Sequence, residues 1–191
     1  KMRRSALLLV FAAVVFFGIN MAQVRAEEKV FDSFEGENEW ADVGWDNVGG
    51  VALAISTEKA SEGKKSLKVI AREEVEDWKN RVVFSREDTL DLSDVNMVLD
   101  IYSDAPSGMS VQIGFDTAGE YYESPKKLLN QGWNKDITFD LGAKDFKCKA
   151  SDWQYNQPLA DRSDITKVFV VVNHPKKMKN AMVFIDNIRF K

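Results

Sequence analysis

Apolar and polar residues alternate with a period of two along most of the chain. The clearest run is Val111, Ile113 and Phe115, which alternates with Gln112 and Asp116. Alternate side chains of a β-strand point to opposite faces, so this spacing predicts half-buried strands. The same spacing, or a β-rich composition, recurs at 51–56, 66–69, 97–102, 137–141, 167–173 and 182–190. No long stretch has the helical period, and we expect about nine or ten short strands.

Polar turn signals separate these runs, such as Gly49-Gly50 and Pro106-Ser107-Gly108. Many short strands joined by polar turns are typical of an antiparallel sandwich or barrel. A parallel sheet requires crossover connections, for which most gaps are too short. The sequence therefore predicts an all-β, antiparallel β-sandwich as one domain over residues 27–191. Its longest irregular stretch, 142–163, is the kind of loop that often carries a binding site.

The first 26 residues have the order of an export signal. Lys1, Arg3 and Arg4 precede an uncharged apolar run from Ala6 to Gly18, and Ala26 supplies a small residue for cleavage. That run is short for a bilayer span and suits a signal peptide, although a retained anchor is the alternative. We expect cleavage after Ala26 and a secreted protein, periplasmic or extracellular, that has no membrane association afterwards.

The charge narrows the classes of partner. Four of the 26 basic residues lie in the first 26 residues, so the remainder has 22 basic and 30 acidic residues and a net charge of −8. An acidic chain is a poor match for nucleic acid or for anionic membranes, whereas neutral sugars impose no charge requirement. Cys148 is the only cysteine, which excludes an internal disulfide.

Four segments resemble those of a known family when they are taken in order. They are VFDSFEGENEW near the start, STEKASEGKKSLKV, GWNKDITFDL, and AMVFIDNIRF at the end. Together they are similar to the β-jelly-roll carbohydrate-binding modules, nearest to family eleven and its galactose-binding-like relatives. The resemblance implies a jelly roll that binds a poly- or oligosaccharide without catalysis, alone or with a carbohydrate-active enzyme.

The resemblance also implies a structural calcium ion. It places Asp32, Glu35, Asp186 and a backbone carbonyl near Lys65 around that ion. Calcium takes six to eight oxygen ligands, and the first and last strands of a sandwich can be neighbours, so the proposed ligand set is chemically reasonable. The alternative is that the first two carboxylates are solvated and that Asp186 caps a turn.

Sugar sites combine flat rings, which pack on apolar sugar faces, with polar side chains that bind hydroxyl groups. The candidates in polar contexts are Trp78, Arg81, Gln112, Asp116, Tyr121, Tyr122, Trp153, Tyr155, Asn173 and His174. Trp78 and Tyr122 are our first candidates for ring platforms, with packing in the core as the alternative for each. Trp40 and Trp133 correspond to structural residues of the family, and Trp45 remains undecided.

Two other functions stay open. A small glycosidase or polysaccharide lyase needs as few as two carboxylates, which 30 acidic residues supply almost anywhere. The Glu-x-Asp-x-x-Glu motif of sandwich-fold glucanases is absent, and His174 is the sole histidine, which disfavours metal-hydrolase and triad chemistry. A structural or assembly protein that uses the jelly roll for protein contacts is the remaining alternative.

Overall fold

A computed structural model describes residues 28–45, 51–71, 81–174 and 182–191. The predicted signal segment and Trp78 lie outside these ranges. The described residues form twelve strands in two antiparallel sheets and one short 3-10 turn, η1 (Lys149–Ser151). None of the helical structure in these ranges is long and apolar enough to cross a membrane. The predicted all-β sandwich is confirmed.

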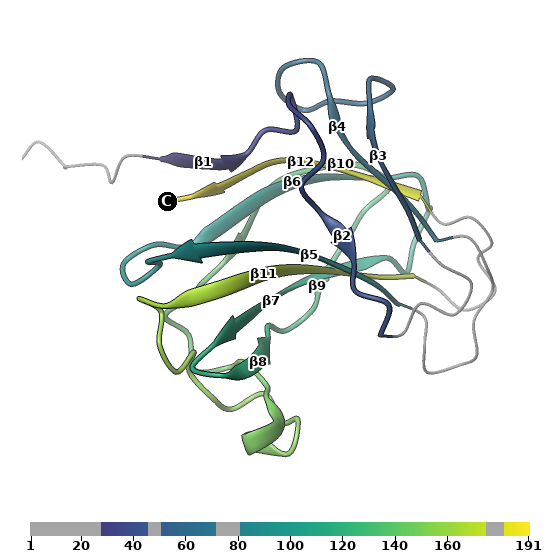
Figure 1. The fold of residues 1–191 in the computed structure, drawn as a ribbon. Coiled ribbons are helices and arrows are strands. Elements are labelled where there is room, and N and C mark those ends of the chain that lie inside the picture. The colour runs from purple at the N-terminus through teal and green to yellow at the C-terminus, as the bar shows by residue number, and fades with distance from the viewer. Residues whose placement is uncertain (1–27, 46–50, 72–80, 175–181) are drawn as a thin grey trace, which may run out of the picture.

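Sheet A contains the two ends of the described chain. Its order is β10 (Gly132–Phe139), β6 (Met97–Ser103), β12 (Met182–Phe190), β4 (Ser66–Ala71) and β3 (Val51–Ser56), with β1 (Lys29–Asp32) paired to β12. The first and last strands are therefore neighbours, and Figure 1 shows them side by side near the C-terminus. Because the pairing is antiparallel, with Lys29 opposite Phe190 and Asp32 opposite Ile188, the segment after β1 runs away from the C-terminus and toward Asp186.

Sheet B forms the second layer of the sandwich (Figure 1). Its order is β2 (Ala41–Asp42), β5 (Arg81–Leu90), β11 (Ile165–Asn173), β7 (Ser110–Thr117) and β8 (Glu120–Glu123), with β9 (Lys127–Leu128) paired to β7. Residues 142–163 form no regular strand, as expected. This segment, drawn in green, lies next to β8 in Figure 1.

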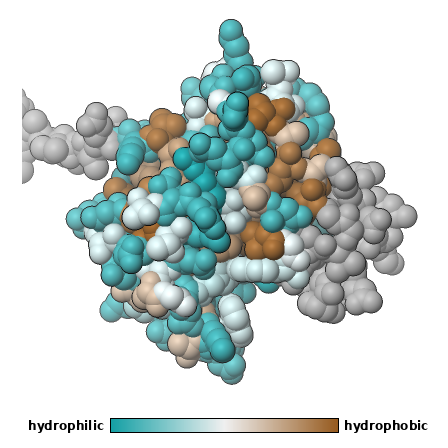
Figure 2. All heavy atoms as spheres, viewed as in Figure 1, coloured by the Kyte–Doolittle hydropathy of each residue, from teal (hydrophilic) through white to brown (hydrophobic). Residues whose placement is uncertain are grey.

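The core lies between the two sheets, and the alternation along β7 shows how the sequence builds it. Val111, Ile113 and Phe115 are fully buried in the main apolar cluster together with residues of sheet A such as Leu99. Trp40 is 3% exposed and packs edge-on against a core phenylalanine, consistent with a structural role. The outside of the sandwich is mostly hydrophilic in the view of Figure 2, with smaller groups of hydrophobic residues, several of them beside the segments drawn in grey.

The outer face of sheet B differs from the rest of this hydrophilic surface because it carries buried apolar side chains. Val83, Phe169 and Val171 form a second apolar cluster there, each at most 1% exposed, on the opposite side from the core. Side chains outside the sheet must therefore cover them. Tyr121 from β8 and Val43 after β2 pack against the cluster and provide part of this cover.

Candidate functional site

Three aromatic rings pack together on the outer face of sheet B. Trp45 stacks on Phe169, with ring centroids 5.4 Å apart at 30°, and Tyr121 meets both rings edge-on at 5.0 Å. The ring of Tyr121 crosses Gly114, where a Cβ atom would lie 2.6 Å from Tyr121 Cε2. Trp45 nevertheless remains 50% exposed. One side of the indole therefore stays available to a ligand.

A pocket of about 390 Å³ opens beside these rings. Its lining residues are Trp45, Arg81, Tyr121, Glu123, Lys147 and Trp153. Trp153 is 49% exposed and comes from the loop 142–163. Its φ of 58° is left-handed, as is that of Asp152 at 51°. Bulky residues rarely adopt this conformation, and such strain concentrates at binding and active sites.

A larger depression, about 510 Å³, lies at the edge formed by β2 and β5. Its lining includes the charged residues Glu39, Arg86, Glu87 and Asp88 and no aromatic ring. Sugar recognition needs an apolar surface as well as polar groups. The smaller, ring-lined pocket is therefore the better candidate site.

The inner wall of the candidate pocket is a buried carboxylate. The side chain of Glu123 is 1% exposed. Its Oε1 accepts hydrogen bonds from Gln112 Nε2 at 2.8 Å and Lys147 Nζ at 2.7 Å. Its Oε2 accepts hydrogen bonds from the Tyr121 hydroxyl at 2.9 Å and Arg81 at 3.1 Å. Two cations and two neutral donors thus compensate the burial of one anion, as a buried charge requires.

Gln112 connects this carboxylate to its surroundings. Asn173 on β11 donates its side-chain amide to Gln112 Oε1 at 3.0 Å. Gln112 Nε2 also lies 2.7 Å from the backbone oxygen of Ser124 and 3.0 Å from the hydroxyl of Tyr155. Strands β7 and β11 and the loop 142–163 therefore meet at one amide.

The protonation states follow from these contacts. Burial opposes the charge of Lys147, but its hydrogen bond to Glu123 and the negative charge of that carboxylate outweigh burial and raise the Lys147 pKa. Burial, together with the neighbouring Glu123, raises the pKa of Tyr121 well above 10.0. Lys147 therefore stays charged and Tyr121 stays protonated at neutral pH. Burial also raises the pKa of Asp116, while Lys167 opposes the shift.

Most of the predicted sugar-binding residues meet at this face. Those on the outer side of sheet B or on the loop beside it are Arg81, Gln112, Asp116, Tyr121, Trp153, Tyr155 and Asn173. Trp78 lies outside the described residues. His174 follows β11 and is 6% exposed, so it presents little surface to a ligand.

The expectation that Tyr122 presents its ring to a ligand is wrong. Tyr122 is 7% exposed and belongs to the main core. In the hairpin of β7 and β8 it lies opposite Phe115, a core residue, whereas Tyr121 lies opposite Asp116 on the outer face. Adjacent strand residues face opposite ways, so only one of the two tyrosines reaches the pocket.

Three pocket residues were not on the predicted list. The sequence leaves Trp45 undecided, and in the structure it follows the two-residue strand β2, which is too short for an alternation to assign it to a face. Glu123 had a signal, because it stands two residues after Tyr121 on the same strand and therefore shares its face. Lys147 lies in an irregular loop, and no sequence pattern places its ammonium group beside Glu123.

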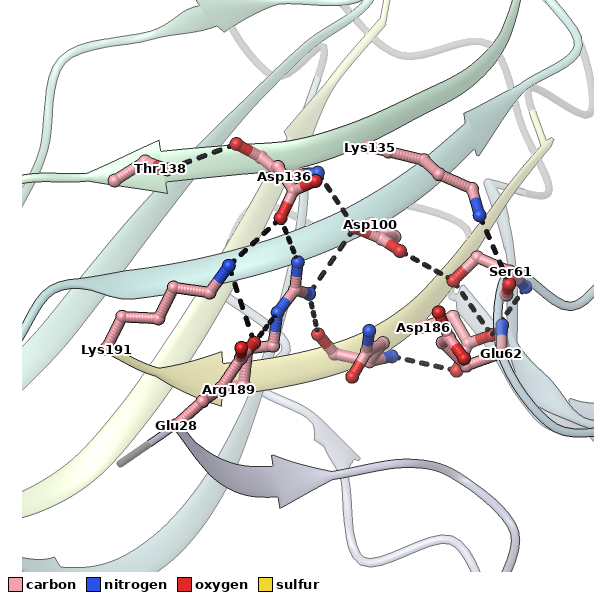
Figure 3. Close-up of polar contacts among 11 residues, drawn as sticks. Glu28, Ser61, Glu62, Asp100, Lys135, Asp136, Thr138, Asp186, Arg189 and Lys191 are labelled. Carbon is pink, nitrogen blue, oxygen red and sulfur yellow. Dashed lines mark hydrogen bonds and ion pairs between the residues drawn. The ribbon is translucent and has the colours of Figure 1, made fainter. Parts of the chain in front are cut away.

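The carboxylates expected to bind calcium instead contact the loop before β4 through its N–H groups. Asp186 is fully buried, and its Oδ2 accepts hydrogen bonds from the backbone N–H of Ser61 at 2.7 Å and of Glu62 at 3.1 Å (Figure 3). Glu35 Oε1 accepts from the N–H of Lys64 at 2.7 Å and of Lys65 at 2.8 Å. These two bonds lower the pKa of Glu35, whereas burial raises that of Asp186.

Asp32 has other partners. Its Oδ2 accepts from Trp40 Nε1 at 2.8 Å and pairs with Arg86 at 3.2 Å. Lys65 points its ammonium group at the backbone oxygen of Glu35, 2.8 Å away. Across the described ranges, no group of three or more His, Cys, Asp or Glu side chains is arranged to hold a metal ion. In this arrangement the residues do not fit the calcium site that the resemblance implies.

A cluster of ion pairs centred on Arg189 adjoins this region (Figure 3). Arg189, whose side chain is 6% exposed, pairs with Asp136, with Glu28, and with the buried Asp100 at 3.4 Å. The Ser61 hydroxyl donates to the second oxygen of Asp100 at 2.8 Å, which links this cluster to the loop on Asp186. The charges in this part of sheet A are compensated within the protein.

Solved structures share this architecture, although no protein-family model and no curated protein matches the chain. The structure is similar to the family 11 carbohydrate-binding module of the cellulosomal cellulase Lic26A-Cel5E of Clostridium thermocellum, with 18% identity and a TM-score of 0.58 over 87% of this chain and 95% of that chain. The chain has the fold of a family 11 carbohydrate-binding module. The expected jelly roll is thereby confirmed.

Two further structures extend the comparison to related modules and to an enzyme. A non-crystalline cellulose specific carbohydrate-binding module, CBM28, has 17% identity and a TM-score of 0.59 over 85% of this chain and 94% of that chain. An exo-β-agarase has 17% identity and a TM-score of 0.58 over 85% of this chain but only 24% of its own. At these identities the likeness to a carbohydrate-binding module concerns the fold.

Proposed function

We propose that this chain is an exported, non-catalytic protein that binds a poly- or oligosaccharide in the pocket on the outer face of sheet B. The observation that carries the proposal is the pair of half-exposed indoles, Trp45 and Trp153, on one pocket with Arg81 and Lys147. Indole rings pack on the apolar faces of sugars, while the cations donate hydrogen bonds to hydroxyl oxygens.

The fold supports the same function. One neighbour, a family 11 module from Clostridium thermocellum in complex with a β-1,3-1,4-mixed-linked tetrasaccharide, has 18% identity and a TM-score of 0.56. The agarase neighbour contains the fold as about a quarter of its chain, which supports cooperation with a carbohydrate-active enzyme. The composition of residues 1–26 supports export.

Glycan binding is tested by screening the protein from Glu27 to Lys191 against an array of soluble polysaccharides, followed by calorimetry on those retained. We expect saturable binding to at least one polysaccharide and no new reducing ends or unsaturated products after prolonged incubation. Released products would establish the glycosidase or lyase alternative. Absence of binding across the array would leave the jelly roll as a protein-contact module.

A further inference from the structure

Glu123 forms part of the inner wall of the pocket without being available to a ligand. Its side chain is 1% exposed, and four donors lie within 3.1 Å of its two oxygens. A carboxylate has about four acceptor sites, so this one is saturated. Any influence of Glu123 on binding must therefore act through the residues that surround it.

Three of its four partners line the pocket. Arg81 and Lys147 have side chains 29% and 18% exposed, and Tyr121 forms part of the aromatic wall. Long cationic side chains lose considerable rotamer freedom when a ligand fixes them. Ion pairs with a buried carboxylate restrict Arg81 and Lys147 before the ligand arrives, so less of that cost remains for binding.

Glu123 also anchors the loop that carries the exposed rings. Its backbone exchanges two hydrogen bonds of 2.9 Å with Lys147, which form an isolated bridge between β8 and the loop 142–163. The Lys147 ammonium group then lies 5.1 Å from the centre of the Tyr155 ring, and Trp153 follows six residues after Lys147. One buried residue thus contacts both cations and the loop.

We propose that Glu123 is a positioning residue of the pocket: it fixes Arg81, Lys147 and the loop with Trp153 and Tyr155 in the arrangement that receives a sugar, and it does not touch the sugar. The polar groups that the described lining offers a ligand are then N–H donors, which suit the hydroxyl and ring oxygens of a glycan. The inference rests on the proposed glycan-binding function.

The test compares Glu123→Gln with Asp100→Asn, a control at a similarly buried carboxylate that also pairs with an arginine but lies in sheet A. Both variants should lose stability. Only Glu123→Gln should lose affinity for the glycan selected by the array, by about tenfold or more, as expected when charged hydrogen bonds are lost. Equal affinity of Glu123→Gln and the unmodified protein would overturn the proposal.

A second readout needs no glycan. Fluorine NMR of protein labelled with fluorotryptophan, with the Trp153 signal assigned through Trp153→Phe, should show a shifted or broadened Trp153 signal in Glu123→Gln and an unchanged one in Asp100→Asn. A moved signal without glycan binding by the unmodified protein would refute the function but retain the positioning of the loop. An unmoved signal in folded Glu123→Gln would refute the positioning role.

If Glu123→Gln does not fold, Lys147→Gln replaces it. This variant keeps the backbone bridge and the buried carboxylate with Arg81 but removes the ammonium group. It should weaken glycan binding severalfold and shift the Trp153 signal in the same direction. A Lys147→Gln protein with unchanged affinity and an unchanged Trp153 signal would overturn the proposal.

Discussion

The molecule buries carboxylates on both of its sheets, and the two groups are compensated in different ways. On sheet B, Glu123 is enclosed by four donors, three of which also line a pocket with half-exposed rings. On sheet A, Asp186 and Asp100 are covered by a loop whose N–H and hydroxyl groups bond to them, and Arg189 closes the cluster. Burial of charge by itself therefore does not identify a site.

The residues around each buried carboxylate determine whether it belongs to a binding pocket or only to the folded framework. Three of the four side-chain partners of Glu123, namely Arg81, Tyr121 and Lys147, line the pocket, so their arrangement affects a ligand. The partners of Asp186 are the N–H groups of Ser61 and Glu62, the Ser61 hydroxyl and the N–H of Asn187, so their arrangement affects the fold. We therefore expect changes on sheet A to alter stability at constant affinity, and changes at the pocket on sheet B to alter affinity more than stability.

The largest effect is expected for Arg189→Met. It leaves Asp100, 3% exposed, and its acidic neighbours without their arginine, and breaking a buried ion pair from one side typically costs about 3–5 kcal/mol. Urea unfolding should show this loss of stability. Glycan affinity of the folded fraction should stay unchanged, and a parallel loss of affinity would contradict the separation of the two regions.

Trp153→Ala should have the opposite signature. The indole is 49% exposed, so its removal opens no core cavity, while loss of an aromatic contact with the ligand weakens binding by about 1.5–3 kcal/mol, or roughly 10- to 150-fold in Kd. Calorimetry and a melting curve measure the two quantities. Trp40→Ala is the control, since Trp40 is 3% exposed and its loss should cost about 3–5 kcal/mol of stability.

The strands were predictable because burial imposes a strict period on them. Val111, Ile113 and Phe115 alternate with Gln112, and the structure separates them to the two faces as expected. The sequence also contained enough information to decide which of Tyr121 and Tyr122 faces outward. Ala118-Gly119 forms a two-residue turn, and this register places Tyr122 opposite Phe115. The alternation along β7 was predicted correctly, but Tyr122 was assigned to the wrong face of the sheet.

The pocket was less predictable because two of its walls come from irregular segments. Trp45 reaches Phe169 from the chain after β2, and Trp153 and Lys147 come from the loop 142–163. Neither segment has a periodicity that assigns side chains to a face. Their positions depend on distant contacts such as the pair of Lys147 and Glu123, which only the folded arrangement reveals.

A smaller effect is expected for Gly114→Ala, which changes the pocket from beneath. The added Cβ would lie 2.6 Å from Tyr121 Cε2 and 2.8 Å from its hydroxyl oxygen, so the ring must move away from the sheet and from Glu123. We expect a loss of about 1 kcal/mol of stability, typical of mild overpacking, and a severalfold weaker Kd. Gly36→Ala, with no atom within 4 Å of its Cβ, should change neither.

The smallest effect is expected for removal of divalent metal, and it tests sheet A most directly. Four N–H groups of the loop 61–65 already bond to Glu35 and Asp186, so a calcium ion would need the loop to turn carbonyl oxygens toward those carboxylates. A chelator should therefore leave the melting temperature unchanged, and mass spectrometry under native conditions should find no metal.

The experiment is sensitive enough to contradict us. A calcium ion that binds only the folded state, at a hundred times its Kd, adds about 2.7 kcal/mol of stability. For a domain of this size that corresponds to roughly 5–10 °C in Tm. A fall of this size on chelation, abolished by Asp186→Ala, would show that the loop rearranges around a metal as the family resemblance implies. Both sheets would then carry a ligand, and the contrast between them would be one of ligand type.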